Sequence, residues 1–178
     1  MRIIGGKYKG KRVQSPKKFP SRPTTDMAKE ALFGILDSRY HWENKDVLDL
    51  FAGTGNISLE FLSRGVQSVL SVDVHPIAIK HLNKILKEWE IVNWSILKKD
   101  AIKFITAAHQ KFDIIFADPP FALKNLPELP DLIFSSDLLN QEGIFILEHG
   151  RENDFQQHPY FTEMRNYGGV VFSFFEKH

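Results

Sequence analysis

The sequence predicts an α/β protein built on a mostly parallel, doubly wound sheet of seven strands with a C-terminal antiparallel hairpin. From residue 46 onward, short apolar runs typical of buried strands alternate with segments of helical period. Such alternation forms parallel βαβ units. The final segment, "FTEMRNYGGVVFSFFEK", instead holds two strand-like runs around Gly168–Gly169 with no helix between them, which predicts the hairpin.

The first residues predict a separate small element. In "RIIGGKYKGKRV", the glycine pair predicts a hairpin of two short strands, and the second strand would carry Lys7, Lys9 and Lys11 on one face. The Pro-rich stretch "SPKKFPSRP" predicts a linker after it.

A helix should follow the linker. Thr24, Thr25 and Asp26 are good N-cap candidates, so we expect a helix that runs to about Asp37. Its expected inward residues are Met27, Ala31, Leu32, Ile35 and Leu36.

The remaining elements follow in regular order. We expect buried strands at "DVLDLF", "SVLSVD", "WSIL", "FDIIFA" and "GIFILEH". The helix "GNISLEFLSRG" should end at Gly65, and Pro76 should open a helix with Ala78, Leu82 and Ile85 on one face. Two shorter helices are expected over residues 101–108 and 129–134.

Length and composition limit the class of protein. A chain of 178 residues suits a single domain, which we divide into a basic N-terminal arm (residues 1–21) and a core (residues 22–178). No apolar run has the length of a membrane span, and "MRIIGGKYKGKR" lacks the apolar stretch of a signal peptide. The chain has no cysteine, which excludes thiolate catalysis and fits a cytoplasmic protein. The seven histidines are scattered, so no metal site is expected.

Charge is distributed unevenly along the chain. Residues 1–25 hold eight Lys and Arg and no Asp or Glu, while the rest holds 15 basic and 22 acidic residues. This asymmetry favours a polyanionic partner, although a solvated basic tail is the alternative. The candidate phosphate contacts are Arg2, Lys7, Lys9, Lys11, Arg12, Lys17 and Lys18.

The segment "DLFAGTGNIS" joins the first buried strand to its helix and is the candidate cofactor loop. Gly53 and Gly55 allow a tight turn and a close approach to a ligand at the carboxyl end of the sheet, although a plain tight turn would also need them. Asp73 ends the next strand 20 residues after Gly53, where a carboxylate can accept hydrogen bonds from ribose hydroxyls.

Two further acids narrow the choice of cofactor. Asp49 lies within the strand before the glycines, and it would repel a pyrophosphate but tolerate a cationic sulfonium. This favours S-adenosylmethionine over a nicotinamide dinucleotide. Asp100 follows the third strand, where it can accept from an adenine amino group, cap the next helix, or do both.

The DPPF corner, residues 118–121, is the candidate substrate site. The strand "FDIIFA" should lie beside the first strand, so Asp118 should emerge next to the cofactor loop. Pro119 and Pro120 restrict the backbone, and Phe121 offers a flat surface for stacking. A carboxylate, free carbonyls and a ring together suit an exocyclic amino group on a nucleobase.

The motifs "RIIGGKYKGKRV", "RPTTDMAKEALF", "LDLFAGTGNISLEFLSRG" and "FADPPF" occur in this order along essentially the whole chain. Together they resemble the RsmD family of bacterial 16S ribosomal RNA guanine-N2 methyltransferases, which are Rossmann-like enzymes that use S-adenosylmethionine. Phe51 stands where many methyltransferases have a first glycine, and "ALKNLPELP" is more Pro-rich than the family pattern.

The resemblance implies roles for particular residues and a partner. It implies a target guanine held by Asp118, Pro119, Pro120 and Phe121, in 16S ribosomal RNA of an assembling small subunit, with the protein acting as a monomer. The implied cofactor contacts are Arg22, Pro23, Thr24, Asp49, Phe51, Ala52, Gly53, Thr54, Gly55, Asp73, Asp100 and Ala101.

Two other functions remain compatible with these motifs. An adenine-N6 methyltransferase also uses an Asp-Pro-Pro-aromatic corner, although DNA recognition usually needs more sequence than this chain has beyond its core. A non-catalytic RNA-binding module could keep the fold, but an intact Asp118 beside an intact glycine loop argues against it.

Overall fold

The computed structural model describes residues 1–17, 19 and 24–177. The strands are β1 (Asp46–Leu50), β2 (Ser68–Asp73), β3 (Trp94–Lys98), β4 (Phe112–Ala117), β5 (Leu139–His149), β6 (Phe161–Tyr167) and β7 (Val170–Glu176). The helices are α1 (Asp26–Arg39), α2 (Asn56–Arg64), α3 (Pro76–Glu88), α4 (Ala101–Ala107) and α5 (Leu129–Ser135), with a 3-10 turn, η1 (Leu126–Glu128), before α5.

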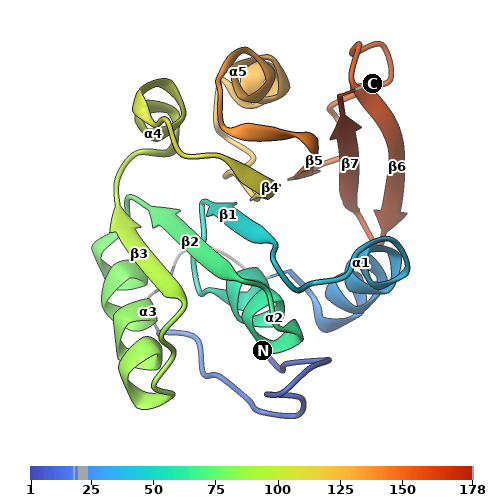
Figure 1. The fold of residues 1–178 in the computed structure, drawn as a ribbon. Coiled ribbons are helices and arrows are strands. Elements are labelled where there is room, and N and C mark those ends of the chain that lie inside the picture. The colour runs from blue at the N-terminus through green and yellow to red at the C-terminus, as the bar shows by residue number, and fades with distance from the viewer. Residues whose placement is uncertain (18, 20–23, 178) are drawn as a thin grey trace.

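The seven strands form one sheet in the order β3-β2-β1-β4-β5-β7-β6 (Figure 1). Strands β1 to β5 pair in parallel, whereas β7 pairs antiparallel with both β5 and β6. The predicted α/β class, the strand content and the C-terminal hairpin are therefore confirmed. Because β1 lies between β2 and β4, the strand order reverses at β1, which is where ligands bind in such sheets.

Helices cover both faces of the sheet (Figure 1). Helices α1, α2 and α3 bury Leu32, Phe61 and Leu82 against one face. Helices α4 and α5 bury Phe104 and Ile133 against the other face. Both faces are apolar, which explains why the central strands read as continuous hydrophobic runs.

Local signals set several boundaries where the sequence predicts them. The Thr25 hydroxyl caps α1 by accepting from the Ala28 N–H at 3.2 Å. Gly65 ends α2 with a φ of 91°, a conformation that glycine adopts without strain, and Pro76 occupies the first turn of α3.

The predicted inward face of α1 is partly wrong. Leu32 and Leu36 are buried, but Met27 is 63% exposed, and the other buried positions include Ala28 and Lys29. The buried stripe is displaced because the ammonium group of Lys29 finds polar partners inside the protein. Apolar periodicity does not predict a lysine in a core.

The predicted N-terminal strands are also wrong. Within the described part of residues 1–21 the structure shows no strand longer than the single antiparallel bridge between Arg2 and Arg12. The chain does reverse, since Ile3 N–H donates to Lys11 O and Gly10 N–H donates to Ile3 O, each at 2.9 Å. The residues between them form turns, because their N–H groups bond to α2 instead of to a second strand.

Among the described residues, no helix combines the length and the apolar character needed to cross a membrane.

Candidate functional site

The carboxyl ends of β1, β4 and β5 bring three acids onto one face of the sheet. In the sheet register, Leu50 pairs with Ala117, and Ala117 pairs with Leu147. Asp118 directly follows β4, and Glu148 follows Leu147 on the adjacent strand β5, so these two acids are neighbours. Because side chains alternate along a strand, Asp49 lies on the same face, toward the layer of α1 and α2.

The glycine loop between β1 and α2 has the left-handed conformations that its sequence predicts. Gly53 has a φ of 55° and Gly55 a φ of 76°. A Cβ atom at Gly55 would lie 2.5 Å from Leu82 Cδ2, so this position requires glycine. Phe51 also has a positive φ, 61°, which is strained for an aromatic residue and is the kind of strain found at ligand sites. Ala52 and Thr54 are buried in the turn.

Asp73 is held at the mouth of this loop. One carboxylate oxygen accepts the Gly53 N–H at 2.8 Å, and the other accepts the His75 N–H at 2.7 Å. Each oxygen has a second acceptor site. The two backbone bonds thus fix a carboxylate that can still bind a pair of hydroxyl groups.

Asp100 caps α4, as one of the two sequence interpretations expects. Its carboxylate accepts the Lys103 N–H at 2.9 Å, and Ala101, the first residue of α4, is buried. The Asp100 side chain is exposed, so the cap leaves an oxygen open to a ligand.

The DPPF corner directly follows β4. The Asp118 N–H donates to Leu50 O at 3.3 Å, which joins the corner to the start of the glycine loop. The backbone then turns, with the Leu123 N–H donating to Pro120 O at 2.8 Å. Phe121 lies in this turn with 59% of its surface exposed. Asp118, three residues earlier, is half-buried, and the role of this corner as a base site stays a prediction.

The three acids share an environment that disfavours their charges. Burial raises the pKa of Asp49 to about 7, despite a hydrogen bond from Ser58. Burial raises the pKa of Glu148 to about 7, and the Thr24 hydroxyl opposes that shift. Burial, with the neighbouring Glu148 and Asp49 charges, raises the pKa of Asp118 well above its usual value. Raised pKa values of this kind are typical of functional sites.

The described residues place no basic side chain in an ion pair with any of these three acids. A cationic ligand would therefore relieve their mutual repulsion. Asp49 lies deepest of the three. Its partner Ser58 also contacts Ser71, and Ser71 accepts a hydrogen bond from Trp94 Nε1 at 2.7 Å, so a chain of polar contacts extends from Asp49 into the protein.

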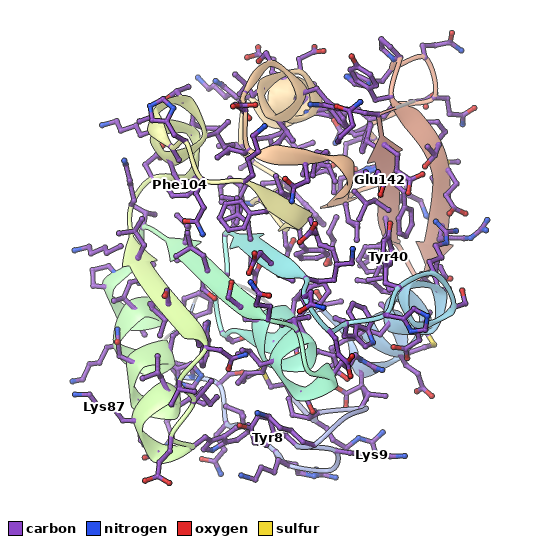
Figure 2. All side chains as sticks on the ribbon, in the orientation of Figure 1. Tyr8, Lys9, Tyr40, Lys87, Phe104 and Glu142 are labelled. Atoms are coloured by element: carbon purple, nitrogen blue, oxygen red, sulfur yellow. The ribbon has the colours of Figure 1, made fainter. Side chains whose placement is uncertain are left out.

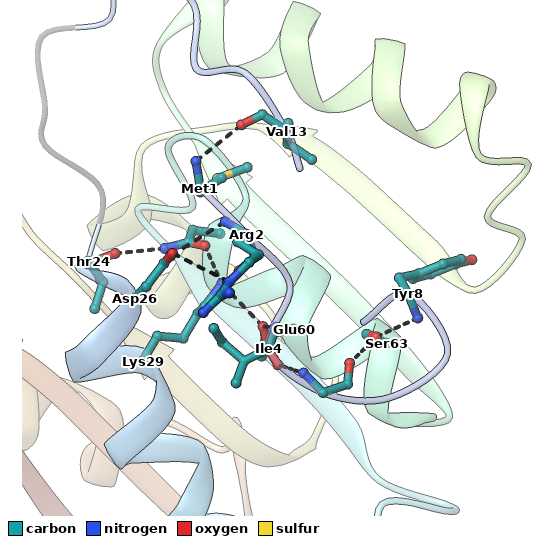
Figure 3. A network of polar contacts seen from close by, with 12 residues as sticks. Met1, Arg2, Ile4, Tyr8, Val13, Thr24, Asp26, Lys29, Glu60 and Ser63 are labelled. Atoms are coloured by element: carbon teal, nitrogen blue, oxygen red, sulfur yellow. Dashed lines mark hydrogen bonds and ion pairs between the residues drawn. The ribbon is translucent and has the colours of Figure 1, made fainter. Parts of the chain in front are cut away.

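A buried polar network links the site to the N-terminal arm (Figure 3). The fully buried Lys29 Nζ donates to Arg2 O at 2.6 Å and to Asn56 Oδ1 at 2.7 Å, and it pairs with Glu60 at 3.2 Å. Asn56 Nδ2 in turn donates to Thr24 O at 2.9 Å. The network therefore extends from the arm to the residue that bonds Glu148.

Glu60 explains how the arm is attached. Its carboxylate accepts the Ile4 N–H at 3.0 Å and the Gly5 N–H at 2.8 Å. Farther along, the Lys7 N–H donates to Ser63 O at 2.7 Å. The arm is packed against α2, and Ile3 is part of the core.

The predicted phosphate contacts that the structure describes lie on the surface, and Figure 2 shows Lys9, with the neighbouring Tyr8, at the edge of the molecule. The Lys7 and Lys11 ammonium groups lie 4.7 Å and 5.1 Å from the centre of the Tyr8 ring, and Lys11 is 4.4 Å from a Trp89 ring. The exposed basic residues of this surface are Arg2, Lys7, Lys9, Lys11, Arg12 and Lys17.

Three predicted site residues lie outside the described residues: Arg22 and Pro23 of the cofactor segment, and Lys18 of the arm. The next residue, Thr24, is described, is buried, and donates to Glu148 Oε2 at 2.7 Å. The predicted cofactor contact of Thr24 stays a prediction, and its partner Glu148 was not predicted from the sequence.

Two residues at the site escaped the sequence prediction. Glu148 belongs to "ILEH", where a single acid inside an apolar run was the available signal. Phe19 packs edge-on against His75, with ring centres 5.6 Å apart, and lies within van der Waals reach of a Cβ at Gly53. Nothing in the Pro-rich linker indicated that its phenylalanine covers the glycine loop.

In the part of the chain that the structure describes, no group of His, Cys, Asp or Glu side chains is arranged to bind a metal ion.

Comparison with known proteins places this site in context. Residues 1–176 match the protein-family model described as conserved hypothetical protein 95. The ribosomal RNA small subunit methyltransferase D of Buchnera aphidicola (subspecies Acyrthosiphon pisum) is 36% identical over 152 residues, covering 84% of this chain and 78% of that protein. The Escherichia coli K12 protein of the same name is 30% identical over 158 residues, covering 86% of this chain and 76% of that protein.

Solved structures show the same architecture. A hypothetical protein of Thermus thermophilus is 27% identical and superimposes with a TM-score of 0.86, covering 99% of both chains. The T. thermophilus 16S rRNA N2 G1207 methyltransferase, RsmC, solved with AdoMet and guanosine, has a TM-score of 0.70 at 23% identity, covering 89% of this chain and 45% of that chain.

Proposed function

Since this chain belongs to the RsmD family of Rossmann-like methyltransferases, we propose that it transfers a methyl group from S-adenosylmethionine to the N2 amine of a guanine in 16S ribosomal RNA. The observation that carries this proposal is the DPPF corner beside the glycine loop. Asp118 follows β4 next to β1, where the strand order reverses, and Phe121 is exposed in the turn after it. The relatives named above act on small-subunit RNA, which supports the same class of substrate here.

The residues at the loop fit S-adenosylmethionine. We assign the ribose hydroxyls to Asp73, which its two backbone bonds hold in place. We assign the adenine edge to Asp100 and Ala101, and the close approach of the ligand to Phe51, Gly53 and Gly55. The three acids, which no described basic side chain pairs with, favour a cofactor that carries positive charge. Bound S-adenosylmethionine would supply an electrophilic methyl group on its sulfonium.

The DPPF corner would activate the guanine amine. The amine lone pair is delocalised into the ring, so the free amine is a poor nucleophile. Hydrogen bonds from the amine to the Asp118 carboxylate and the Pro119 carbonyl would localise that lone pair and stabilise positive charge on nitrogen. Phe121 would stack on the base and align it. As the nitrogen–carbon bond forms and the sulfur–carbon bond breaks, the nitrogen loses a proton, which we assign to Asp118.

The experiment is methylation of RNA by the purified protein with isotope-labelled S-adenosylmethionine. Its substrates are small ribosomal subunits from a strain that lacks the endogenous enzyme, the same RNA without proteins, and duplex DNA. We expect N2-methylguanosine at one site, with more product on the assembled particle, because a small protein depends on folded RNA to present the base. N6-methyladenosine, a comparable rate on DNA, or no product at all would contradict the proposal.

A further inference from the structure

Glu148 is buried at the end of β5, beside the acid that we assign to the target base. It is 4% exposed, and it follows Leu147, the residue paired with Ala117 just before Asp118. Neighbouring parallel strands lie about 4.8 Å apart, so Glu148 and Asp118 are adjacent across the sheet, near enough for the charge of Glu148 to act on Asp118. Its position depends on a residue 124 positions earlier, since Thr24 Oγ1 donates to Glu148 Oε2 at 2.7 Å.

We propose that Glu148 is a positioning residue for methyl transfer, which acts through Asp118: Thr24 holds the Glu148 carboxylate against Asp118, where its charge makes Asp118 a stronger proton acceptor. This inference rests on the proposed function. It extends that function, because neither the DPPF corner nor the cofactor loop contains Glu148.

The geometry supports an electrostatic role and not a packing role. A packing residue at this position would be apolar, as Ile144, Phe145, Ile146 and Leu147 before it are. Burial raises the pKa of Glu148 to about 7, and the hydrogen bond from Thr24 opposes that shift and so supports the charged form. A buried charge destabilises a protein. This one lies next to Asp118, the acid that we assign as proton acceptor, where a neighbouring negative charge affects the reaction.

Burial raises the pKa of Asp118 most, and among the charged groups of the described residues Glu148 has the largest effect on it. From β1, Asp49 adds a smaller contribution of the same sign, and it bonds to Ser58. From β2, Asp73 is held by backbone N–H groups at the glycine loop. From α1 and α2, Lys29 and Glu60 pair with each other, and β7 places Phe172 opposite Glu148.

The test compares pH profiles of single-turnover methyl transfer by the full chain on assembled subunits. Activity should fall as the pH drops through the pKa of Asp118, since the carboxylate form accepts the proton. We call this fall of activity at low pH the acid limb. In Glu148→Gln the midpoint of the acid limb should move down by about one to two pH units, because the negative charge that repels the Asp118 carboxylate is gone. The plateau rate should fall about threefold to tenfold, because a weaker base accepts the proton less readily.

Three variants serve as controls. Glu142→Gln makes the same substitution at an exposed position of the same strand (Figure 2) and should leave the limb unchanged. Glu148→Asp keeps the charge and should retain the wild-type limb. Adding Glu148→Gln to Asp118→Asn should not shift the pH profile of the residual activity, because the titrating carboxylate of Asp118 is absent.

A second measurement does not depend on activity. Carboxyl-carbon NMR of the full chain should show the Asp118 titration moving to lower pH in Glu148→Gln, whose amide oxygen can still accept from Thr24 so that the fold is kept. An unchanged Asp118 titration or an unchanged acid limb would overturn the role of Glu148. If instead the wild-type protein methylates no RNA, the proposed function fails while the NMR result still decides the coupling.

Discussion

Asp118 and Asp73 are both acids at strand ends, but their surroundings suit them to different ligands. Asp118 is crowded by Glu148 and Asp49, and its pKa is raised, which suits a group that accepts a proton. Asp73 is bonded by two backbone N–H groups, which suits a fixed acceptor of hydroxyl groups. The same side-chain chemistry is thus divided between two roles by burial and neighbours.

Replacing Asp118 should separate catalysis from cofactor binding. Asp118→Ala should lower methyl transfer at least about 100-fold, because both the amine acceptor and the proton acceptor are lost. Its affinity for S-adenosylmethionine, measured by calorimetry, should stay within about threefold of wild type, since we assign Asp118 to the base and not to the cofactor. Asp118→Asn should be more active than Asp118→Ala, because an amide oxygen still accepts one hydrogen bond. Equal loss of affinity and activity in Asp118→Ala would disprove this assignment.

Replacing Asp73 should have the opposite signature. Each charge-assisted hydrogen bond to ribose is worth about 1.5–3 kcal/mol, so Asp73→Ala should weaken S-adenosylmethionine binding at least tenfold in calorimetry. Asp137→Ala, which removes an exposed acid paired with Lys111, is the matched control and should bind normally. Unaltered affinity in Asp73→Ala would rule out the ribose contact.

At the scale of elements, α1, α2 and the N-terminal arm are joined by the buried pair Lys29–Glu60. Burial lowers the pKa of Lys29, and Glu60 opposes this shift. Lys29 also donates to Arg2 O, and Glu60 accepts from the Ile4 and Gly5 N–H groups. Both ions are therefore hydrogen-bonded to the backbone as well as to each other. Removing Lys29 leaves the buried Glu60 with Arg64 as its one ion-pair partner among the described residues, at 3.0 Å. It also leaves Arg2 O and Asn56 Oδ1 without their donor, so breaking the pair from this side is costly.

Lys29→Met should therefore reduce the free energy of unfolding by about 3–5 kcal/mol in urea denaturation. The control is Lys84→Met, which breaks the exposed pair Lys84–Glu88 on α3 and should cost less than about 1 kcal/mol. If the two variants were equally stable, the buried network would not hold the arm and the two helices together.

At the scale of the whole molecule, opposite charges occupy different regions. Six exposed basic residues lie on the described part of the N-terminal arm, beside α2 and the end of α3, while Asp49, Asp118 and Glu148 line the site. The arm cannot simply be removed to test its role, since Ile3 is 1% exposed and Val13 is 8% exposed in the core. A deletion would expose apolar surface as well as remove charge.

An arm with three of its lysines replaced by uncharged residues tests RNA binding without exposing apolar surface. In the triple variant Lys7→Gln, Lys9→Gln and Lys11→Gln, the slope of log affinity for RNA against log salt should become shallower by about 2, because three phosphate contacts are lost. A matched variant with Gln at Lys98, Lys103 and Lys111, three exposed lysines outside the arm, should keep the wild-type slope. Identical slopes in the two variants would show that the arm is a solvated tail.

The sequence by itself determined the features that depend on neighbouring residues. Strand and helix order follows from apolar periodicity, and the bounds of α2 and α3 follow from Gly65 and Pro76. The glycine loop and the DPPF corner were predicted because backbone conformations at Gly53, Gly55 and the two prolines depend on the residues themselves.

Only the tertiary structure decided which distant groups meet. Thr24 and Glu148 are 124 residues apart, and Lys29 and Glu60 come from different helices, so no local pattern pairs them. The arm was predicted as two strands because its turn residues allow a hairpin. It forms turns because the buried Glu60 carboxylate binds its Ile4 and Gly5 N–H groups more favourably than water would. Long-range polar partners of this kind exist only once the core has formed, which is why they lie beyond sequence patterns.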